Sequence, residues 1–144
     1  MSSNVQGTKN KASEYGTYIK NSTGRVISHN VYWISSDNQY KSLSQLPKSK
    51  VDVRMLSSKK GNTESEWTLK ISNTSDKIAF FVRPQLMTSG EEVLPSYWTG
   101  SYFTLAPSES TTISVSCPAS RLKGKKPHIL VSGWSIDPVE MKLN

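Results

Sequence analysis

The chain contains one cysteine and two histidines among its 144 residues. A single cysteine excludes an internal disulfide, and with so few histidines no set of zinc ligands occurs at a usual spacing. The sequence also lacks a run of about 20 apolar residues, the length that a transmembrane helix requires. Residues 1–11 are polar and show no apolar core of a signal peptide. We therefore expect no metal, no cofactor and no contact with a membrane.

The length of the chain and the distribution of its charge argue against two further classes of function, a barrel enzyme and a nucleic-acid-binding protein. A catalytic (β/α)8 barrel needs roughly 250 residues, so this chain is too short to contain one. The net charge is +7, but the basic residues are spread along the sequence and the dense run Lys123–Lys126 includes a glycine typical of a loop. No nucleic-acid-binding motif accompanies that run, so we expect no nucleic-acid partner.

Apolar residues alternate with polar ones along most of the chain, which indicates β-strands, and no segment keeps the spacing of an amphipathic helix. Turn-forming residues separate the alternating segments. From Val51 onward these are Val51–Met55, Trp67–Ile71, Ile78–Val82, Tyr102–Leu105, Thr111–Val115, Ile129–Trp134 and Val139–Leu143. The sequence therefore predicts an all-β protein, an immunoglobulin-like β-sandwich of about seven strands over residues 50–144.

Three features of the sandwich follow from the same pattern. The segment Ile78–Val82 is apolar at nearly every position, which predicts a central strand covered on both faces. The link Ala106–Ser110 predicts a hairpin between its two strands, and Trp67 or Trp134 is expected to supply a core tryptophan. Cys117 shares its face with apolar neighbours, so we expect a buried structural thiol and not a reactive one.

The N-terminal part does not fit this count. Residues 25–34 predict one further strand, but the residues before it are too few and too polar to form a second sandwich. We interpret residues 1–38 as the last strand of a preceding domain together with the start of a linker, and residues 39–49 as the linker.

Several stretches resemble a known family. The runs Asn30–Ser35 and Lys77–Arg83, the segment Glu92–Pro95, then Trp98, Tyr102–Leu105 with Pro107, and the closing Val131–Trp134 occur in its order and spacing. The chain is identified as similar, over about residues 30–136, to the C-terminal immunoglobulin-like domain of glycoside hydrolase family 2. The enzymes concerned are of the exo-β-D-glucosaminidase, β-mannosidase and mannosylglycoprotein endo-β-mannosidase type. The chain departs from the family pattern at three places. Gly100-Ser101 stands where the family usually has an acidic and an amide residue. Ser108 stands in place of the usual Gly, and Ser135 in place of the usual Asn.

The resemblance implies a non-catalytic accessory module that packs on and orients the other domains of a secreted or periplasmic glycosidase acting on β-linked glucosamine or mannose. The catalytic glutamate pair of such enzymes lies on a barrel, and no segment here matches it. A free-standing carbohydrate-binding module, with polysaccharide as its partner, is the alternative; an independent enzyme has the least support.

Candidate site residues are few. Tyr97, Trp98 and Tyr102 form the densest aromatic cluster, which predicts either packing within the module or against another domain, or stacking on a sugar. We expect Glu91-Glu92 to be a solvated loop pair without catalytic geometry, and Arg83 to form an ion pair at a sheet edge. The patterns Asn21-Ser22-Thr23 and Asn73-Thr74-Ser75 fit N-glycosylation but also ordinary turns.

Overall fold

The structure, a computed structural model, describes residues 2–7, 12–20, 26–35 and 46–144. The chain divides into two compact units, Met1–Pro47 and Lys48–Asn144. The division falls inside the expected linker, residues 39–49, most of which lies outside the described residues. The origin of residues 1–38 as part of a preceding domain stays a prediction.

The first unit contains a three-stranded antiparallel sheet in the order β1-β2-β3, with β1 at Ser2–Gly7, β2 at Ala12–Lys20 and β3 at Val26–Ser35. Strand β3 confirms the strand expected at residues 25–34. The sequence pattern did not predict β1 and β2, because their residues are mostly polar and give no alternation. The segment therefore contributes a small sheet and not a single strand.

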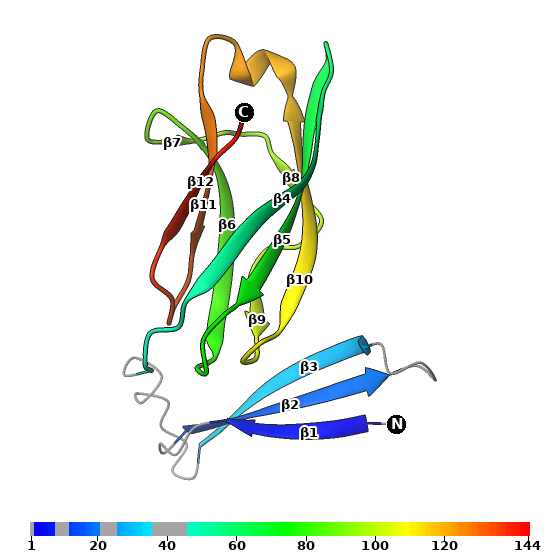
Figure 1. Ribbon diagram of the computed structural model, residues 1–144, viewed down its shortest axis with the longest axis vertical. Coiled ribbons are helices and arrows are strands. Elements are labelled where there is room, and N and C mark those ends of the chain that lie inside the picture. The colour runs from blue at the N-terminus through cyan, green and yellow to red at the C-terminus, as the bar shows by residue number, and fades with distance from the viewer. Residues whose placement is uncertain (1, 8–11, 21–25, 36–45) are drawn as a thin grey trace. The chain divides into compact units, whose positions relative to one another are not determined.

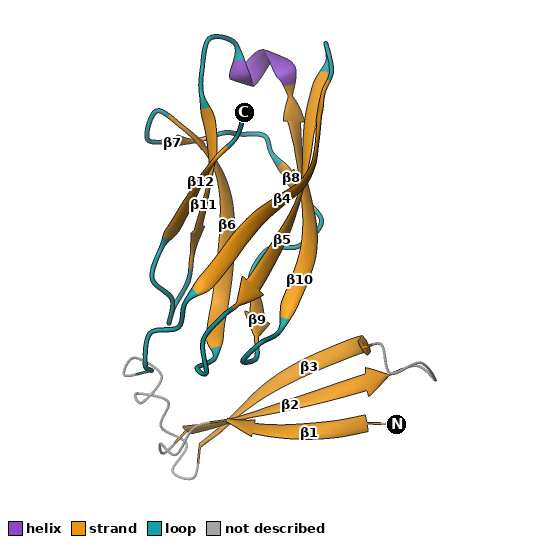
Figure 2. Cartoon of the chain, in the orientation of Figure 1, coloured by secondary structure: helices purple, strands orange, loops and turns teal. Residues whose placement is uncertain are grey.

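The second unit is a sandwich of two sheets (Figures 1 and 2). The first sheet has the order β4-β5-β10-β8 and the second has the order β12-β11-β6-β7, with β9 also paired to β6. All strand pairs of both sheets are antiparallel. The strands are β4 Val51–Lys60, β5 Glu64–Asn73, β6 Ala79–Thr88, β7 Glu91–Glu92, β8 Tyr97–Trp98, β9 Phe103–Leu105, β10 Ser110–Pro118, β11 Pro127–Ser132 and β12 Val139–Lys142. A short 3-10 helix, η2 at Ala119–Leu122, follows β10.

The all-β immunoglobulin-like sandwich is thus confirmed. The seven expected segments each contribute a strand, and the two strands that the sequence did not predict, β7 and β8, have only two residues each. A two-residue strand is too short to show a period in its sequence, so only pairing with its neighbours reveals it.

The core lies between the two sheets and follows from the alternation in β5 and β10. Alternate residues of β5 are buried, and Trp67 pairs with Val115 of β10 while Leu69 pairs with Ile113. Trp67 has no exposed surface, whereas Trp134 is more than half exposed, so Trp67 is the core tryptophan. Cys117 is fully buried on the same face of β10, as expected.

Strand β6 differs from its prediction. It pairs with strands on both sides, but its outer face is only partly covered: Gln85 is buried there, whereas Phe81 is 48% exposed. The register of β6 against β9 shifts between Ala79 and Val82, so β6 carries one extra residue there, a β-bulge. The bulge turns Phe81 outward, which is why an apolar run did not mean burial on both faces.

The expected hairpin over Ala106–Ser110 is also wrong. Strand β9 pairs with β6 of the second sheet, whereas β10 pairs with β5 and β8 of the first. The link therefore crosses from one sheet to the other (Figure 1). Sequence spacing alone cannot distinguish the two arrangements, because both need a tight turn between short strands.

Asn73, at the end of β5, stabilises this crossing through hydrogen bonds of its side chain. Its side chain is buried, and Nδ2 donates hydrogen bonds to the carbonyl oxygens of Lys77 at 2.6 Å, Leu105 at 3.1 Å and Ala106 at 3.3 Å. Oδ1 accepts from the backbone and hydroxyl groups of Ser75 at 3.1 and 2.8 Å. Because the amide is 1% exposed and fully engaged, the turn interpretation of Asn73-Thr74-Ser75 holds and a glycan does not fit there.

Two of the departures from the family pattern have visible consequences. Ser135, in place of Asn, is fully buried, accepts from the Phe80 backbone N–H and donates to the Ile78 carbonyl, each at 3.0 Å. Ser108, in place of Gly, has a φ of 64°. It follows Pro107 in a turn closed by a bond from Glu109 N–H to the Ala106 carbonyl at 3.0 Å, the position where type II turns favour Gly.

We expect Ser108→Gly to raise the free energy of unfolding by up to about 1 kcal/mol. A non-glycine residue at positive φ costs roughly 1–2 kcal/mol, and the greater freedom of unfolded glycine offsets part of this gain. Chemical denaturation measures the change, with Ser110→Gly in β10 as the control that should destabilise. A loss of stability in Ser108→Gly would contradict the role assigned to the turn.

Candidate functional site

Within the described residues, no group of three or more His, Cys, Asp or Glu side chains lies together in a way that could hold a metal ion. The same residues contain no helix long and apolar enough to cross a membrane. The remaining candidates for a functional site are groups of side chains on the surface of the sandwich.

The adjacent carboxylates Glu91 and Glu92 form strand β7, where successive side chains point to opposite faces. Glu92 has a defined geometry that the sequence did not predict, because its Oε2 accepts from Arg83 Nη2 and from Gln85 Nε2, both at 3.1 Å. The ion pair expected for Arg83 is therefore present. The Glu92 carboxylate serves as the acceptor for two neighbours on β6.

The three predicted aromatic residues do not form one cluster. Tyr97 and Trp98 make up β8 and pair with β10 of the first sheet. Trp98 is partly buried and packs against the core, while Tyr97 is 62% exposed. Tyr102 precedes β9, which pairs with β6 of the second sheet. The part of Trp98 that faces the core serves packing, and any contact of these residues with a sugar or another domain stays a prediction.

Tyr102 instead contacts a residue that sequence reasoning did not select. Its ring centroid lies 4.8 Å from that of Phe81, and the ring planes are tilted by 45°. The Arg83 guanidinium carbon lies 5.8 Å from the centroid of Tyr102, within the range of a cation–π interaction. The signal for Phe81 was present as two consecutive phenylalanines, but only the β-bulge shows which of them faces outward.

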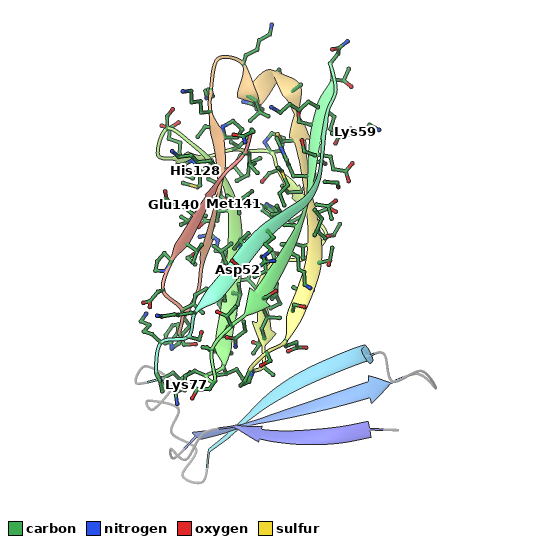
Figure 3. All side chains as sticks on the ribbon, in the orientation of Figure 1. Asp52, Lys59, Lys77, His128, Glu140 and Met141 are labelled. Carbon is green, nitrogen blue, oxygen red and sulfur yellow. The ribbon has the colours of Figure 1, made fainter. Side chains whose placement is uncertain are left out.

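Several lysines that are scattered along the sequence lie close together on the surface of the sandwich. An open hollow of about 740 Å³ is lined by Lys60, Lys125, Lys126, Pro127, His128, Glu140, Lys142, Leu143 and Asn144. Its lysines come from β4, from the loop before β11 and from β12, while His128 and Glu140 lie on β11 and β12 (Figure 3). Residues far apart in sequence thus share one positive region, which scattered spacing could not reveal.

Cys117 faces the core from β10. Burial, and then the nearby Glu64 carboxylate, raise the pKa of its thiol, because both disfavour the thiolate. A neutral, enclosed thiol is a poor nucleophile. The structural role expected for this cysteine agrees with its surroundings.

We expect the native chain to react with a thiol reagent at least about 100-fold more slowly than the unfolded chain, since labelling requires the core to open. The contribution of the thiol to the free energy of unfolding should be constant below the ordinary thiol pKa and should fall above it, because the unfolded state then releases a proton that the native state retains. Labelling kinetics in buffer and in denaturant check the first result, and Cys117→Ala serves as the blank. Equal rates would contradict the burial.

Comparisons with known proteins agree with this geometry. The sequence profile described as exo-β-D-glucosaminidase Ig-fold domain matches residues 30–136. The chain is 30% identical to the exo-β-D-glucosaminidase of Arthroderma benhamiae, over 83% of this chain and 15% of that enzyme. It is also 30% identical to the exo-β-D-glucosaminidase of Amycolatopsis orientalis, over 81% of this chain and 14% of that enzyme.

The fold is similar to a part of a solved enzyme. The crystal structure of Amycolatopsis orientalis exo-chitosanase CsxA matches with a TM-score of 0.79 and 25% identity, covering 93% of this chain and 18% of that one. The chain thus spans only about 15% of the length of the curated relatives it matches. Because the profile match covers most of its length and confirms the resemblance seen in the sequence, the chain belongs to the exo-β-D-glucosaminidase Ig-fold domain family.

Proposed function

We propose that this chain is a non-catalytic accessory module of a glycoside hydrolase family 2 exo-β-D-glucosaminidase and that it packs on and orients the other domains of that enzyme. The observation that carries the proposal is the uneven coverage of the match, which takes in 83% of this chain but 15% of a relative with that activity in its name. A secreted or periplasmic parent, implied by the resemblance, is part of the same proposal.

The chemistry of the described residues supports a non-catalytic role. Retaining glycosidases use two carboxyl groups about 5–5.5 Å apart on either side of the scissile bond. Here the two adjacent glutamates lie on opposite faces of β7, and Glu92 is engaged by Arg83 and Gln85. The interior between the sheets is filled by aliphatic residues, Cys117 and Trp67.

The names of the relatives favour a glucosaminidase parent. Both sequence relatives described above are exo-β-D-glucosaminidases, and the structural relative is an exo-chitosanase. The sequence resemblance by itself left β-mannosidase open, and neither name includes it. We therefore assign glucosaminidase as the parent activity in this proposal.

Two measurements test the proposal together. The 144-residue chain alone should show no turnover of nitrophenyl β-D-glucosaminide. A chimera of the Amycolatopsis orientalis enzyme, in which residues 30–136 of this chain replace the matching region, should be folded and active. Turnover by the chain alone would overturn the non-catalytic role, and a folded but inactive chimera would overturn the role in domain arrangement.

A further inference from the structure

A stripe of side chains runs along β6 on the outer face of the second sheet. Residues at i and i+2 of a strand share a face, so Phe81, Arg83 and Gln85 follow one another along the strand, and Tyr102 adjoins them from the segment before β9. Gln85 is buried at 9% exposure and supports the stripe from beneath Glu92. From Phe81 to Gln85 the stripe spans about 13 Å. It combines two half-exposed aromatic rings with a guanidinium, an amide and the Glu92 carboxylate.

The bulge that presents Phe81 is held from several directions. Ser135 Oγ accepts from the Phe80 N–H at 3.0 Å, and the Trp134 N–H donates to the Phe80 carbonyl at 3.1 Å. Gly133 lies so close that a Cβ there would come within 2.9 Å of the Phe81 carbonyl oxygen. Contacts from the turn after β11 therefore hold the backbone of β6 in the conformation that directs Phe81 outward.

Both aromatic residues occupy strained backbone. The φ angles of Phe81 and Tyr102 are 57° and 53°, a region that bulky residues rarely adopt because it carries a steric cost. Glycine would remove this cost at either position. Burial does not explain the rings, because Phe81 is 48% and Tyr102 is 50% exposed. Strain kept for exposed rings points to a ligand surface.

The polar groups beside the rings are fixed in place. Glu92 Oε2 accepts from both Arg83 and Gln85 at 3.1 Å, and Arg83 also lies over the ring of Tyr102. Both bonds end on the same oxygen, so the second carboxylate oxygen is left to accept a bond from a ligand. The stripe thus offers apolar faces and oriented polar groups with little entropy left to lose on binding.

We propose that this stripe binds a β-linked hexosamine oligosaccharide; the sugar class, though not the location, rests on the proposed function. A β-linked pyranose has a flat face of C–H groups that packs against an aromatic ring, and its equatorial hydroxyl and nitrogen substituents lie where the partly exposed Arg83 and Glu92 can bond them. The length suits roughly two or three sugar units. The surface area of two rings and one ion pair is far smaller than the roughly 1,200 Å² that a stable protein interface buries, so the stripe suits a sugar better than a protein partner.

The test is calorimetric titration of the full chain with two probes, glucosamine hexamers and their N-acetylated counterparts, with cellohexaose as the non-amino control. Binding of either hexosamine probe supports the proposal. Phe81→Gly and Tyr102→Gly should each weaken that binding by about tenfold or more, corresponding to the loss of one stacking contact. Neither should lower the melting temperature, because glycine relieves the positive φ.

The matched control is Tyr97→Ala, which removes a tyrosine that is more exposed than Tyr102 from β8 of the other sheet and should leave binding unchanged. Absence of binding to every sugar, or equal weakening by Tyr97→Ala, would overturn the site. Equal affinity for cellohexaose would overturn the choice of amino sugar. If no sugar binds and Phe81→Gly inactivates the chimera described above, the stripe is a contact between domains and the sugar proposal fails while the accessory role stands.

Discussion

Replacing Trp67 with alanine should lower the free energy of unfolding by about 3–5 kcal/mol. Trp67 has no exposed surface and lies in β5 between two partner strands, opposite Ser58 of β4 and Val115 of β10. Truncation removes the largest fully buried side chain among the residues whose burial the structure describes, and it leaves a cavity that aliphatic neighbours in paired strands can close only in part. Since small domains are stable by roughly 5–15 kcal/mol, this loss is a large share of the total.

A second substitution separates packing from polarity at the same position. The Trp67 Nε1–H is buried and has no hydrogen-bond partner among the described residues. An unsatisfied buried donor costs about 1–3 kcal/mol, so Trp67→Phe removes that cost while losing part of the ring volume. We expect Trp67→Phe to stay within about 1 kcal/mol of the original chain.

Urea denaturation followed by circular dichroism measures both variants, with the exposed Tyr97→Ala as the control that should change stability by less than about 0.5 kcal/mol. A loss below about 1 kcal/mol in Trp67→Ala would show that the sandwich does not depend on this core residue. Equal losses in both variants would instead show that the indole nitrogen has a partner in solution.

Replacing Asn73 with alanine should cost about 2–4 kcal/mol, because one buried amide holds two crossings of the sandwich. Its Nδ2 donates to the Lys77 carbonyl in the turn before β6 and to the carbonyls of Leu105 and Ala106 in the link between the sheets. An NH2 group has two hydrogens, so the two longer contacts share one of them. Alanine would remove all three bonds, and the Ala106 carbonyl would keep only its bond from the Glu109 N–H.

The neighbouring Thr74 provides the matched control. Thr74 is exposed, and its hydroxyl makes one bond to the Lys50 carbonyl at 3.3 Å, so Thr74→Ala should cost at most about 0.5 kcal/mol. Thermal and urea unfolding of the two variants provide the comparison. Similar losses at both positions would contradict the assignment of the stabilising role to the buried amide.

Much of the sandwich could be predicted from local pattern. The alternation in β5 and β10 is carried by residues whose buried face is purely apolar, so a period of two was enough to place Trp67, Leu69, Val115 and Cys117 in the core. The weaker predictions concern polar strands. Strands β1 and β2 show no apolar period, and β7 and β8 are too short to show any.

The candidate site was predicted less well than the core. Sequence proximity suggested that Tyr97, Trp98 and Tyr102 belong together, but the chain between them passes from the first sheet to the second. Arg83 and Glu92 were assigned separately, although pairing of β6 with β7 brings them into one ion pair. Strand pairing joins segments that are apart in the sequence. It therefore places Tyr102 on a different sheet from Tyr97 and Trp98, and it brings Arg83 next to Glu92.

The sequence by itself determined the fold class, the core faces of β5 and β10, the buried structural cysteine and membership in a family, because these depend on period, residue type and ordered motifs. Tertiary structure alone decided that Phe81 turns outward, that Tyr102 meets both Phe81 and Arg83, and that Asn73 binds both crossings. These features depend on one extra residue in β6 and on contacts between segments far apart in the chain, and such contacts leave no local pattern to read.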